Sequence, residues 1–355
     1  VKVPVKNLLG KRGEGFRIAL SILHIGRIKL GANVIGAGKR TITQTVNYAN
    51  ERKQFGKTIA NFGAIKYKIA EQVIRIFAAE SALYRVSKYI DDTIALMLSQ
   101  GIENGKADVE GVAKYAVECA LMKVYGSETL DYIVDEAVQV YGGMGFSAET
   151  PIERSYRDSR INRIFEGTNE INRMLVIDTA LKSAMKGEIA LFEKAKSVFE
   201  SIDDIPDVQF SNETQFFDTL NTLVLNLKKA VLLIIGVGFE KYKKQLLSKQ
   251  QVMMNLSDMM MQSYIAESTL LRVQKLNNKN GAQQIYRDIA DTFIYDAASR
   301  IQKSGLDAIN SLIEGDLRIK ITEGLMKLTQ AKPVDVSETR TRIADVIIEE
   351  NRYKL

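Results

Sequence analysis

Glu166 is the residue whose sequence setting best suits proton transfer. It lies in the stretch IFEGT, where Ile164 and Phe165 precede it and Gly167 follows. Apolar neighbours strip water from a carboxylate and so strengthen it as a general base, while glycine lets a substrate approach the backbone closely. Thr168 is a suitable N-cap for the helix that we predict next. These residues alone leave two interpretations open, a catalytic base and a solvated glutamate ahead of a capped helix.

A glycine-rich turn precedes this stretch in the chain. A helical pattern stops at Gly142 and Gly143, and Gly145 follows two residues later. Glycines leave backbone amides unshielded by side chains, and a nest of such amides can receive a phosphate group. The other interpretation is a helix C-cap with a tight turn, and the GGMG stretch by itself favours this second interpretation.

The scarcity of cysteine and histidine excludes several kinds of site. The chain has one cysteine, Cys119, and one histidine, His24. A disulfide framework and a metal site built from several cysteines or histidines are therefore excluded, and we predict no bound metal. A Ser-His-Asp triad has at most one candidate histidine.

The composition indicates a soluble protein with a small basic surplus. Its 355 residues are 46% hydrophobic, enough for real cores in about two domains, and its net charge is +6. The surplus lies in residues 1–189, where it suits an anionic small ligand, although a solvated basic face is the commoner explanation. A dense block of Lys and Arg interleaved with aromatic residues is absent, so we expect no nucleic-acid binding. The longest apolar run, in residues 230–239, is shorter than the roughly 18 residues of a membrane span.

Helical periodicity runs through almost the whole chain. From Ile65, apolar residues recur every three or four positions opposite a charged face. Similar stripes occupy residues 16–50, 109–125, 130–141, 168–185, 217–249, 252–276, 283–304 and 338–350. Residues 199–212 break this pattern with an acidic cluster and a proline. We therefore predict an all-α fold of two helical bundles, in residues 1–189 and 217–355, joined by a linker in residues 190–216.

Three motifs in order resemble those of the acyl-CoA dehydrogenase family. Residues 164–171, IFEGTNEI, are similar to the family's catalytic segment, and residues 49–65 are similar to its flavin-contacting loop. The family's C-terminal signature is matched at Gln139, Gly142, Gly143, Gly145, Phe146, Glu149, Arg154 and Asp158. The half after residue 190 most resembles the appended helical domain of the very-long-chain branch. The resemblance thus implies the family's C-terminal four-helix bundle followed by a second helical domain.

The resemblance also implies that the chain is the C-terminal portion of a longer enzyme. Residues 1–13 are similar to the connector that leaves the family's β domain. Since that domain and a preceding helical domain cover the flavin, we expect this portion by itself to bind flavin weakly or not at all and to be inactive.

The activity that the resemblance implies is oxidation of an acyl-CoA to a trans-2-enoyl-CoA in fatty-acid β-oxidation. In the family, a carboxylate removes the α-proton while a hydride leaves the β-carbon for the flavin of FAD, and Glu166 matches that carboxylate. The backbone amide of the base and a flavin hydroxyl stabilise the enolate-like oxygen. Some branches carry the base at the position that matches Gly26, where a glycine cannot serve.

The same resemblance assigns the remaining site residues. Those that match FAD contacts are Arg52, Gln54, Phe55, Gln139, Gly142, Gly143, Thr168 and Glu170. Arginine is the expected partner for the FAD pyrophosphate, and the match makes the phosphate nest the favoured interpretation of the glycine turn. Those that match substrate contacts are His24, Arg27, Phe165 and Gly167. For His24, a partly buried structural histidine remains the alternative.

The partners implied are an acyl-CoA substrate, an electron-transfer flavoprotein and a second copy of the chain, because flavin contacts in the family cross between subunits. Some relatives also contact a membrane through the region that matches residues 186–225, but Asp203, Asp204 and Asp207 oppose contact with an anionic bilayer. We expect a bacterial cytoplasmic protein, with the mitochondrial matrix as the alternative. The competing hypothesis for function is a scaffold or assembly protein derived from the family, with weak or no turnover.

Overall fold

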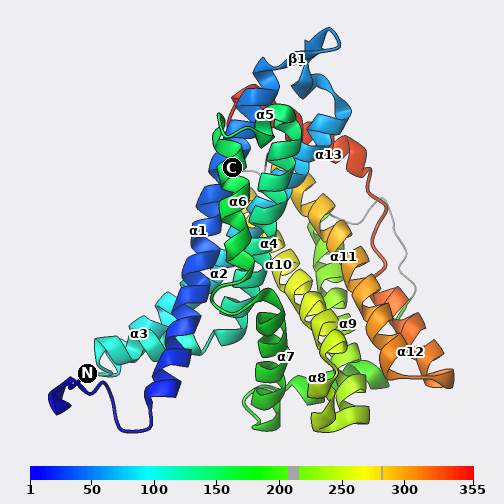
Figure 1. Ribbon diagram of the computed structural model, residues 1–355. Coiled ribbons are helices and arrows are strands. Elements are labelled where there is room, and N and C mark those ends of the chain that lie inside the picture. Colours follow the sequence, from blue (N-terminus) through cyan, green and yellow to red (C-terminus); the bar gives the residue numbers. More distant parts are fainter. Residues whose placement is uncertain (207–215, 281–282) are drawn as a thin grey trace.

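The computed structural model describes residues 1–206, 216–280 and 283–355, and the chain is built almost entirely of helices (Figure 1), which confirms the all-α prediction. The helices are α1 (Gly15–Glu51), α2 (Gly63–Ser99), α3 (Asn104–Ala113), α4 (Ala116–Tyr141), α5 (Gly143–Phe146), α6 (Pro151–Ser159), α7 (Asn169–Met185), α8 (Leu191–Glu200), α9 (Phe216–Tyr242), α10 (Gln250–Asn280), α11 (Gln284–Leu312), α12 (Gly315–Leu328) and α13 (Val336–Glu350). Short 3-10 turns are η1 (Val5–Asn7), η2 (Ile59–Asn61), η3 (Arg160–Arg163) and η4 (Lys243–Ser248). The strands β1 (Lys53–Gln54) and β2 (Lys57–Thr58) form one antiparallel hairpin.

The first half of the chain is built on the packing of α1 against α4. These two helices approach closely at Gly31 and Gly126, where a Cβ atom on Gly126 would lie 2.9 Å from Cγ2 of Val34. Glycine is required because any side chain there would push the two backbones apart. The close packing fixes the position of α1 relative to α4, and both helices carry residues of the site described below.

The second half packs on the first through one shared core. Helices α9, α10 and α11 contact one another, α10 also contacts α2 and α7, and α13 returns to α2 (Figure 1). Fully buried residues of both halves, such as Phe77 and Leu227, belong to the same hydrophobic cluster. The limits of the two predicted domains stay a prediction, since the apolar core is continuous between them.

Several elements differ from the sequence-based expectations. Helix α8 lies within residues 190–216, which we expected to be a linker, and the ring of Phe192 stacks on that of Phe239 in α9 at 4.2 Å between centroids. The remainder of that expected linker, with Asp207, falls partly outside the described residues. Helices α6 and α12 were not predicted. Helix α6 is short and has few apolar residues, whereas α12 carries a regular apolar stripe, at Ile321, Leu325 and Leu328, that the sequence analysis missed.

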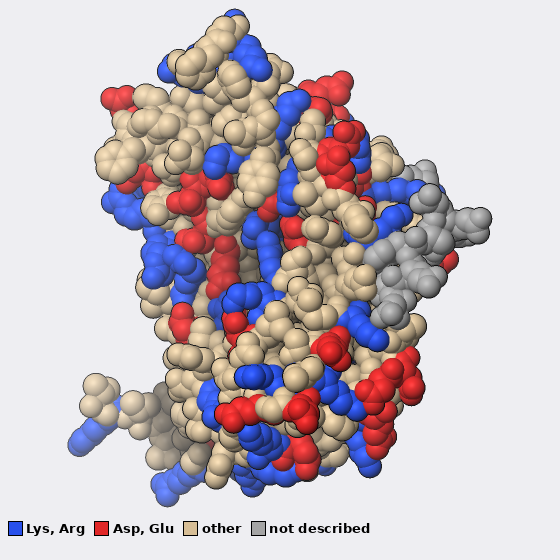
Figure 2. All heavy atoms as spheres, turned by 90° about the vertical axis from the view of Figure 1, so that its right-hand side faces the viewer, with Lys and Arg blue, Asp and Glu red and all other residues tan. Residues whose placement is uncertain are grey.

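Charged side chains are mixed over the face that α11, α12 and α13 present. Figure 2 shows Lys and Arg interspersed with Asp and Glu on this face, with apolar surface between them. This distribution agrees with the balanced charge of the second half of the sequence.

Two helices are long and apolar enough, by length and composition alone, to cross a membrane. They lie in Ile18–Glu51 and Phe216–Ser248. Core helices of soluble proteins pass the same test; both helices contact others in this chain, with 28% of the apolar window buried in the first and 56% in the second. Solubility therefore stays a prediction.

Candidate active site

The loop between η3 and α7 holds Glu166 in an unusual backbone conformation. The φ angle of Glu166 is +60° and that of Gly167 is +83°. A residue with a side chain rarely adopts positive φ, and such strained positions persist where the surroundings fix them, often at functional sites. Thr168 then caps α7, since its Oγ1 accepts a hydrogen bond from the backbone N–H of Ile171 at 3.3 Å. This confirms the predicted N-cap.

The carboxylate of Glu166 packs against the backbone of α1 at Gly26. A Cβ atom on Gly26 would lie within 2.7 Å of both carboxylate oxygens, closer than any real contact of that kind. The Glu166 side chain can therefore lie in this position only because residue 26 is a glycine. The structure thus places side by side the two positions, 26 and 166, that the sequence resemblance associates with the base, and of these Glu166 bears a carboxylate.

Two buried side chains hold the Glu166 carbonyl. Nε of Arg27 donates to it at 3.2 Å, and Nδ2 of Asn172 lies 3.4 Å from it. Nη1 of Arg27 also donates to Nδ1 of His24 at 3.2 Å, so His24 accepts at that nitrogen. Burial, and then the charge of Arg27, lower the pKa of His24, and burial also lowers the pKa of Arg27. The imidazole is therefore neutral near pH 7.

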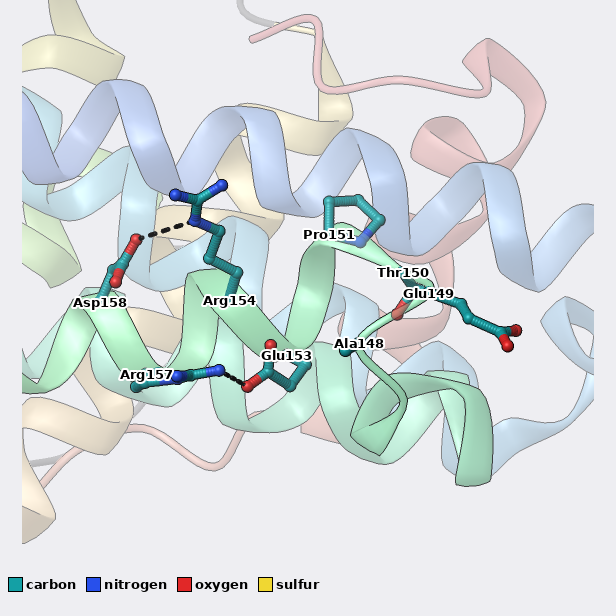
Figure 3. Close-up of a pocket in the computed structure, with 8 residues that line it drawn as sticks. All are labelled: Ala148, Glu149, Thr150, Pro151, Glu153, Arg154, Arg157 and Asp158. Carbon is teal, nitrogen blue, oxygen red and sulfur yellow. Dashed lines mark hydrogen bonds and ion pairs between the residues drawn. The ribbon is translucent and has the colours of Figure 1, made fainter.

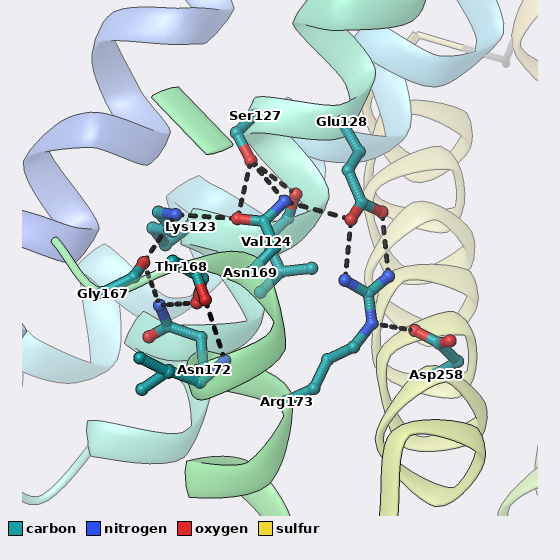
Figure 4. A network of polar contacts seen from close by, with 11 residues as sticks. Lys123, Val124, Ser127, Glu128, Gly167, Thr168, Asn169, Asn172, Arg173 and Asp258 are labelled. Carbon is teal, nitrogen blue, oxygen red and sulfur yellow. Dashed lines mark hydrogen bonds and ion pairs between the residues drawn. The ribbon is translucent and has the colours of Figure 1, made fainter. Parts of the chain in front are cut away.

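A buried lysine anchors the next carbonyl of the loop (Figure 4). Lys123 of α4 is fully buried, and its Nζ donates to the Gly167 carbonyl at 2.8 Å and to Oδ1 of Asn169 at 2.7 Å. Burial lowers the pKa of Lys123 to about 8. Nδ2 of Asn172 donates to the same Gly167 carbonyl at 2.8 Å and to that of Thr168 at 3.0 Å. Three successive carbonyls are therefore fixed.

The backbone N–H of Glu166 faces no such partner. Within the described residues it makes no hydrogen bond, although the carbonyls of Glu166, Gly167 and Thr168 are held. The loop thus presents a free amide donor beside a carboxylate. An amide so placed can stabilise negative charge that develops on a nearby oxygen.

The residues predicted to meet FAD fall into two groups at different places in the chain. Thr168 and Glu170 lie beside Glu166, where hydrogen bonds from its own backbone amide and from Thr168 lower the pKa of the Glu170 carboxyl. The hairpin residues Arg52, Gln54 and Phe55 lie instead at the far end of α1 (Figure 1). About 38 Å of helix separates Gly26 from the end of α1 at Glu51, at 1.5 Å per residue.

The glycine turn lies at the same end of α1 as the hairpin. The rings of Tyr48 in α1 and Tyr141 in α4 stack at 4.0 Å between centroids, so the end of α4 is pinned beside the hairpin. Gly142 has φ +58° and begins the tight turn before α5, and Gln139 is exposed on the last turn of α4. The turn geometry is the one predicted from GGMG, and its role as a phosphate nest stays a prediction.

The hairpin side chains are exposed. The side chain of Phe55 is 91% exposed at φ +51°, and the guanidinium of Arg52 has no partner in the parts of the chain that the structure describes. A large exposed aromatic ring in a strained conformation beside a free guanidinium is typical of a binding surface.

Three other signature residues, Glu149, Arg154 and Asp158, line a hollow on α6 (Figure 3) with a volume of about 660 Å³. Arg154 and Asp158 lie one turn apart with 3.9 Å between Nε and Oδ2, and Arg157 pairs with Glu153. Glu149 points away from them in Figure 3. Arg154 and Asp158 also line a second groove, against α1, with Phe165. Exposed ion pairs of this kind contribute little stability.

Comparison with known proteins gives the family. Two family models, each described as acyl-CoA dehydrogenase, C-terminal domain, match residues 13–181 and 226–327. A probable acyl-CoA dehydrogenase of Bacillus subtilis (strain 168) is 40% identical over 99% of this chain and 59% of its own length. The chain belongs to the acyl-CoA dehydrogenase family. The resemblance of the three motifs is confirmed.

Two further relatives cover both halves of this acyl-CoA dehydrogenase chain. The human very long-chain specific acyl-CoA dehydrogenase, mitochondrial, is 30% identical over 88% of this chain and 47% of its own length. The crystal structure of an acyl-CoA dehydrogenase complexed with FAD, from Bacillus anthracis, matches with a TM-score of 0.95 and 39% identity, and covers 99% of this chain and 60% of that chain. The chain therefore spans between 47% and 60% of the length of these relatives.

The loop around Glu166 was located from the sequence, but the apolar neighbours expected to strip water from its carboxylate are not buried, since Ile164 is 47% and Phe165 is 45% exposed. The residues that hold the loop were not predicted. In the structure Glu166 lies beside two sets of predicted site residues. Phe165, Gly167 and Thr168 belong to the same loop, and His24 and Arg27 belong to α1. The side chains that reasoning missed are Lys123, Asn169 and Asn172. The sequence does carry a signal for Lys123, which lies inside the apolar stretch ALMKVY. A lysine buried in such a stretch must find polar partners.

Proposed function

We propose that the full-length protein oxidises an acyl-CoA to the trans-2-enoyl-CoA, with Glu166 as the base that removes the α-proton. The observation that carries the proposal is the Glu166 carboxylate seated against Gly26 on a strained, heavily anchored loop. Strain at one residue costs about 1–3 kcal/mol, and a structural glutamate gives no reason to retain it.

Residues 164–168, named the base loop from here on, supply two groups for this reaction. The Glu166 carboxylate accepts the α-proton, and the free N–H of the same residue donates to the thioester oxygen, where negative charge develops as the proton leaves. Arg27 and Asn172 keep the Glu166 carbonyl turned away, so that the amide side of the loop faces the substrate. FAD, when bound, accepts the hydride from the β-carbon.

The described residues fit FAD at two separate surfaces. Thr168 and Glu170 lie next to the proposed base, while the free guanidinium of Arg52, the exposed ring of Phe55 and the Gly142 turn form the second surface about 38 Å along α1. Arginine and backbone amides are suited to a pyrophosphate, and an exposed aromatic ring is suited to stacking on a base. One chain cannot apply both surfaces to one dinucleotide, which supports a homodimer with a composite site.

The same proposal assigns the remaining partners. His24 and Arg27, on α1, are proposed to meet the CoA portion of the substrate, with His24 neutral and able to donate from Nε2. An electron-transfer flavoprotein is proposed as the acceptor of the electrons. Family membership supports both assignments, and the position of His24 and Arg27 beside Glu166 supports the first.

The test is the reduction of bound flavin by a series of acyl-CoA thioesters in the full-length protein. Glu166→Gln should keep the bound flavin and slow its reduction by about 10²–10⁴-fold, the usual contribution of a general base. Glu188→Gln, an exposed glutamate paired with Lys186 near the end of α7, is the matched control and should reduce flavin at the normal rate. Near-normal reduction in Glu166→Gln with flavin bound would show the proposal to be wrong.

A further inference from the structure

We propose that Asp258, in the appended half of the chain, is a positioning residue for the base loop and acts through Arg173. The proposal rests on the proposed role of Glu166 as the base. It assigns to the second half of the chain a direct part in the geometry of proton removal.

Arg173 joins three helices at one point (Figure 4). Its side chain, on α7, is 11% exposed, and its Nε donates to Oδ1 of Asp258 on α10 at 2.7 Å. Its two terminal nitrogens donate to the two carboxylate oxygens of Glu128 on α4, at 2.7 Å and 2.9 Å. A guanidinium held in this way by two carboxylates has one favourable orientation, because all of its donors on that side are used.

The contacts continue from Glu128 to the base loop without a gap. Oε1 of Glu128 also accepts from Nδ2 of Asn169 at 3.0 Å, and Oδ1 of Asn169 accepts from Nζ of Lys123 at 2.7 Å. Nζ of Lys123 reaches the Gly167 carbonyl, next to Glu166, at 2.8 Å. Every polar link between Asp258 and the loop is thus 3.0 Å or shorter.

The strained loop needs such support to keep its shape. Positive φ at Glu166 persists only while neighbouring groups over-determine it, and Asn169 and Arg173 lie on the first turns of the helix that starts right after the loop. When Asp258 is lost, the nearly buried Arg173 guanidinium keeps one carboxylate partner instead of two. The guanidinium and the first turn of α7 can then shift, and the adjoining base loop can shift with them. Even a small shift of the proposed base lowers the rate of proton removal.

The first test compares variants of the full-length holoenzyme. Asp258→Ala should lower the rate constant of flavin reduction by acyl-CoA about tenfold, the scale of coupling between packed positions, with acyl-CoA binding changed less than twofold. Asp258→Asn keeps the shape and one acceptor oxygen, so it should recover part of the rate. The matched control is Asp178→Ala, which breaks the 2.7 Å pair between Asp178 and Lys182 on the exposed side of the same helix α7 and should leave the rate unchanged.

The second test reads the loop itself, by hydrogen exchange of backbone amides in the same proteins without added substrate. Exchange of peptides covering residues 164–172 should be faster in Asp258→Ala than in Asp178→Ala. Equal exchange and equal rates in these two variants would overturn the inference, and so would a loss confined to acyl-CoA binding. If exchange responds to Asp258→Ala while Glu166→Gln keeps normal turnover, the positioning network holds and the proposed base is wrong. Asp258→Asn carries both tests if Asp258→Ala fails to fold.

Discussion

Substitution of Gly26 by alanine is a sharp probe of the base, because it adds one methyl group at the point where the Glu166 carboxylate rests. A Cβ atom there would lie within 2.7 Å of both carboxylate oxygens. Ordinary contacts need about 3.5 Å, so the carboxylate must move by roughly 1 Å. A misplacement of about 1 Å can cost about 10²-fold in rate, and that is the loss that we expect in flavin reduction by acyl-CoA.

The stability of this variant should change little. Alanine in place of glycine inside a helix stabilises by about 0.5–1 kcal/mol, while overpacking costs about 1–3 kcal/mol, so the two effects partly cancel. Gly36→Ala is the matched control on the same helix, since nothing lies within 4 Å of its added Cβ atom. It should gain stability and keep full activity.

A second substitution makes the test specific to the carboxylate. Glu166→Asp shortens the side chain by one methylene, which withdraws the carboxylate from the added methyl group. Gly26→Ala should therefore cost much less in a Glu166→Asp background than in the native one. The reasoning would be refuted if Gly26→Ala reduced flavin within twofold of the native rate, or if its cost were the same in both backgrounds.

Two further predictions concern the anchors of the loop. Burial lowers the pKa of Lys123 to about 8 in the folded chain, against about 10.5 in the unfolded chain. Between these two pH values the unfolded chain binds more protons than the folded one. The free energy of unfolding should therefore rise with pH over this range, by up to about 3 kcal/mol from this group. Urea unfolding at pH 8 and pH 10 measures the rise, which Lys123→Met should lack; equal pH dependence in both proteins would contradict the burial argument. Thr168→Ala should lose about 1 kcal/mol through loss of the N-cap of α7, measured by urea unfolding without flavin, whereas Thr168→Ser keeps the capping oxygen and should lose little. Equal losses in the two variants would show that the cap does not account for the effect.

The local motifs of the sequence predicted the loop, the glycine turn and most of the helices, because each depends on residues close together in the chain. Periodicity located α1 almost to the residue, and the IFEGT stretch located both Glu166 and the cap on α7. The two-residue strands of the hairpin are too short to show alternation. Residues 190–200 were expected to be linker because that short amphipathic segment lies next to a stretch with an acidic cluster and a proline.

The support of the loop could not be predicted because it is made by tertiary contacts. Lys123 meets Asn169 across 46 positions of sequence, and Arg173 meets Asp258 across 85. Each of these residues has a helical neighbourhood of its own, and their meeting follows only from how α4, α7 and α10 pack. The separation along α1 of the two groups of residues predicted to meet FAD also required the structure, since their motifs gave no distance.

Exchange of the α-hydrogen of an acyl-CoA with solvent deuterium is the most direct test of Glu166 as the base. In the full-length protein with FAD bound, exchange at the α-carbon should be catalysed by the native chain and should fall by at least about 10²-fold in Glu166→Gln, at equal occupancy by acyl-CoA. Exchange in Glu166→Gln at the native rate would contradict the central claim.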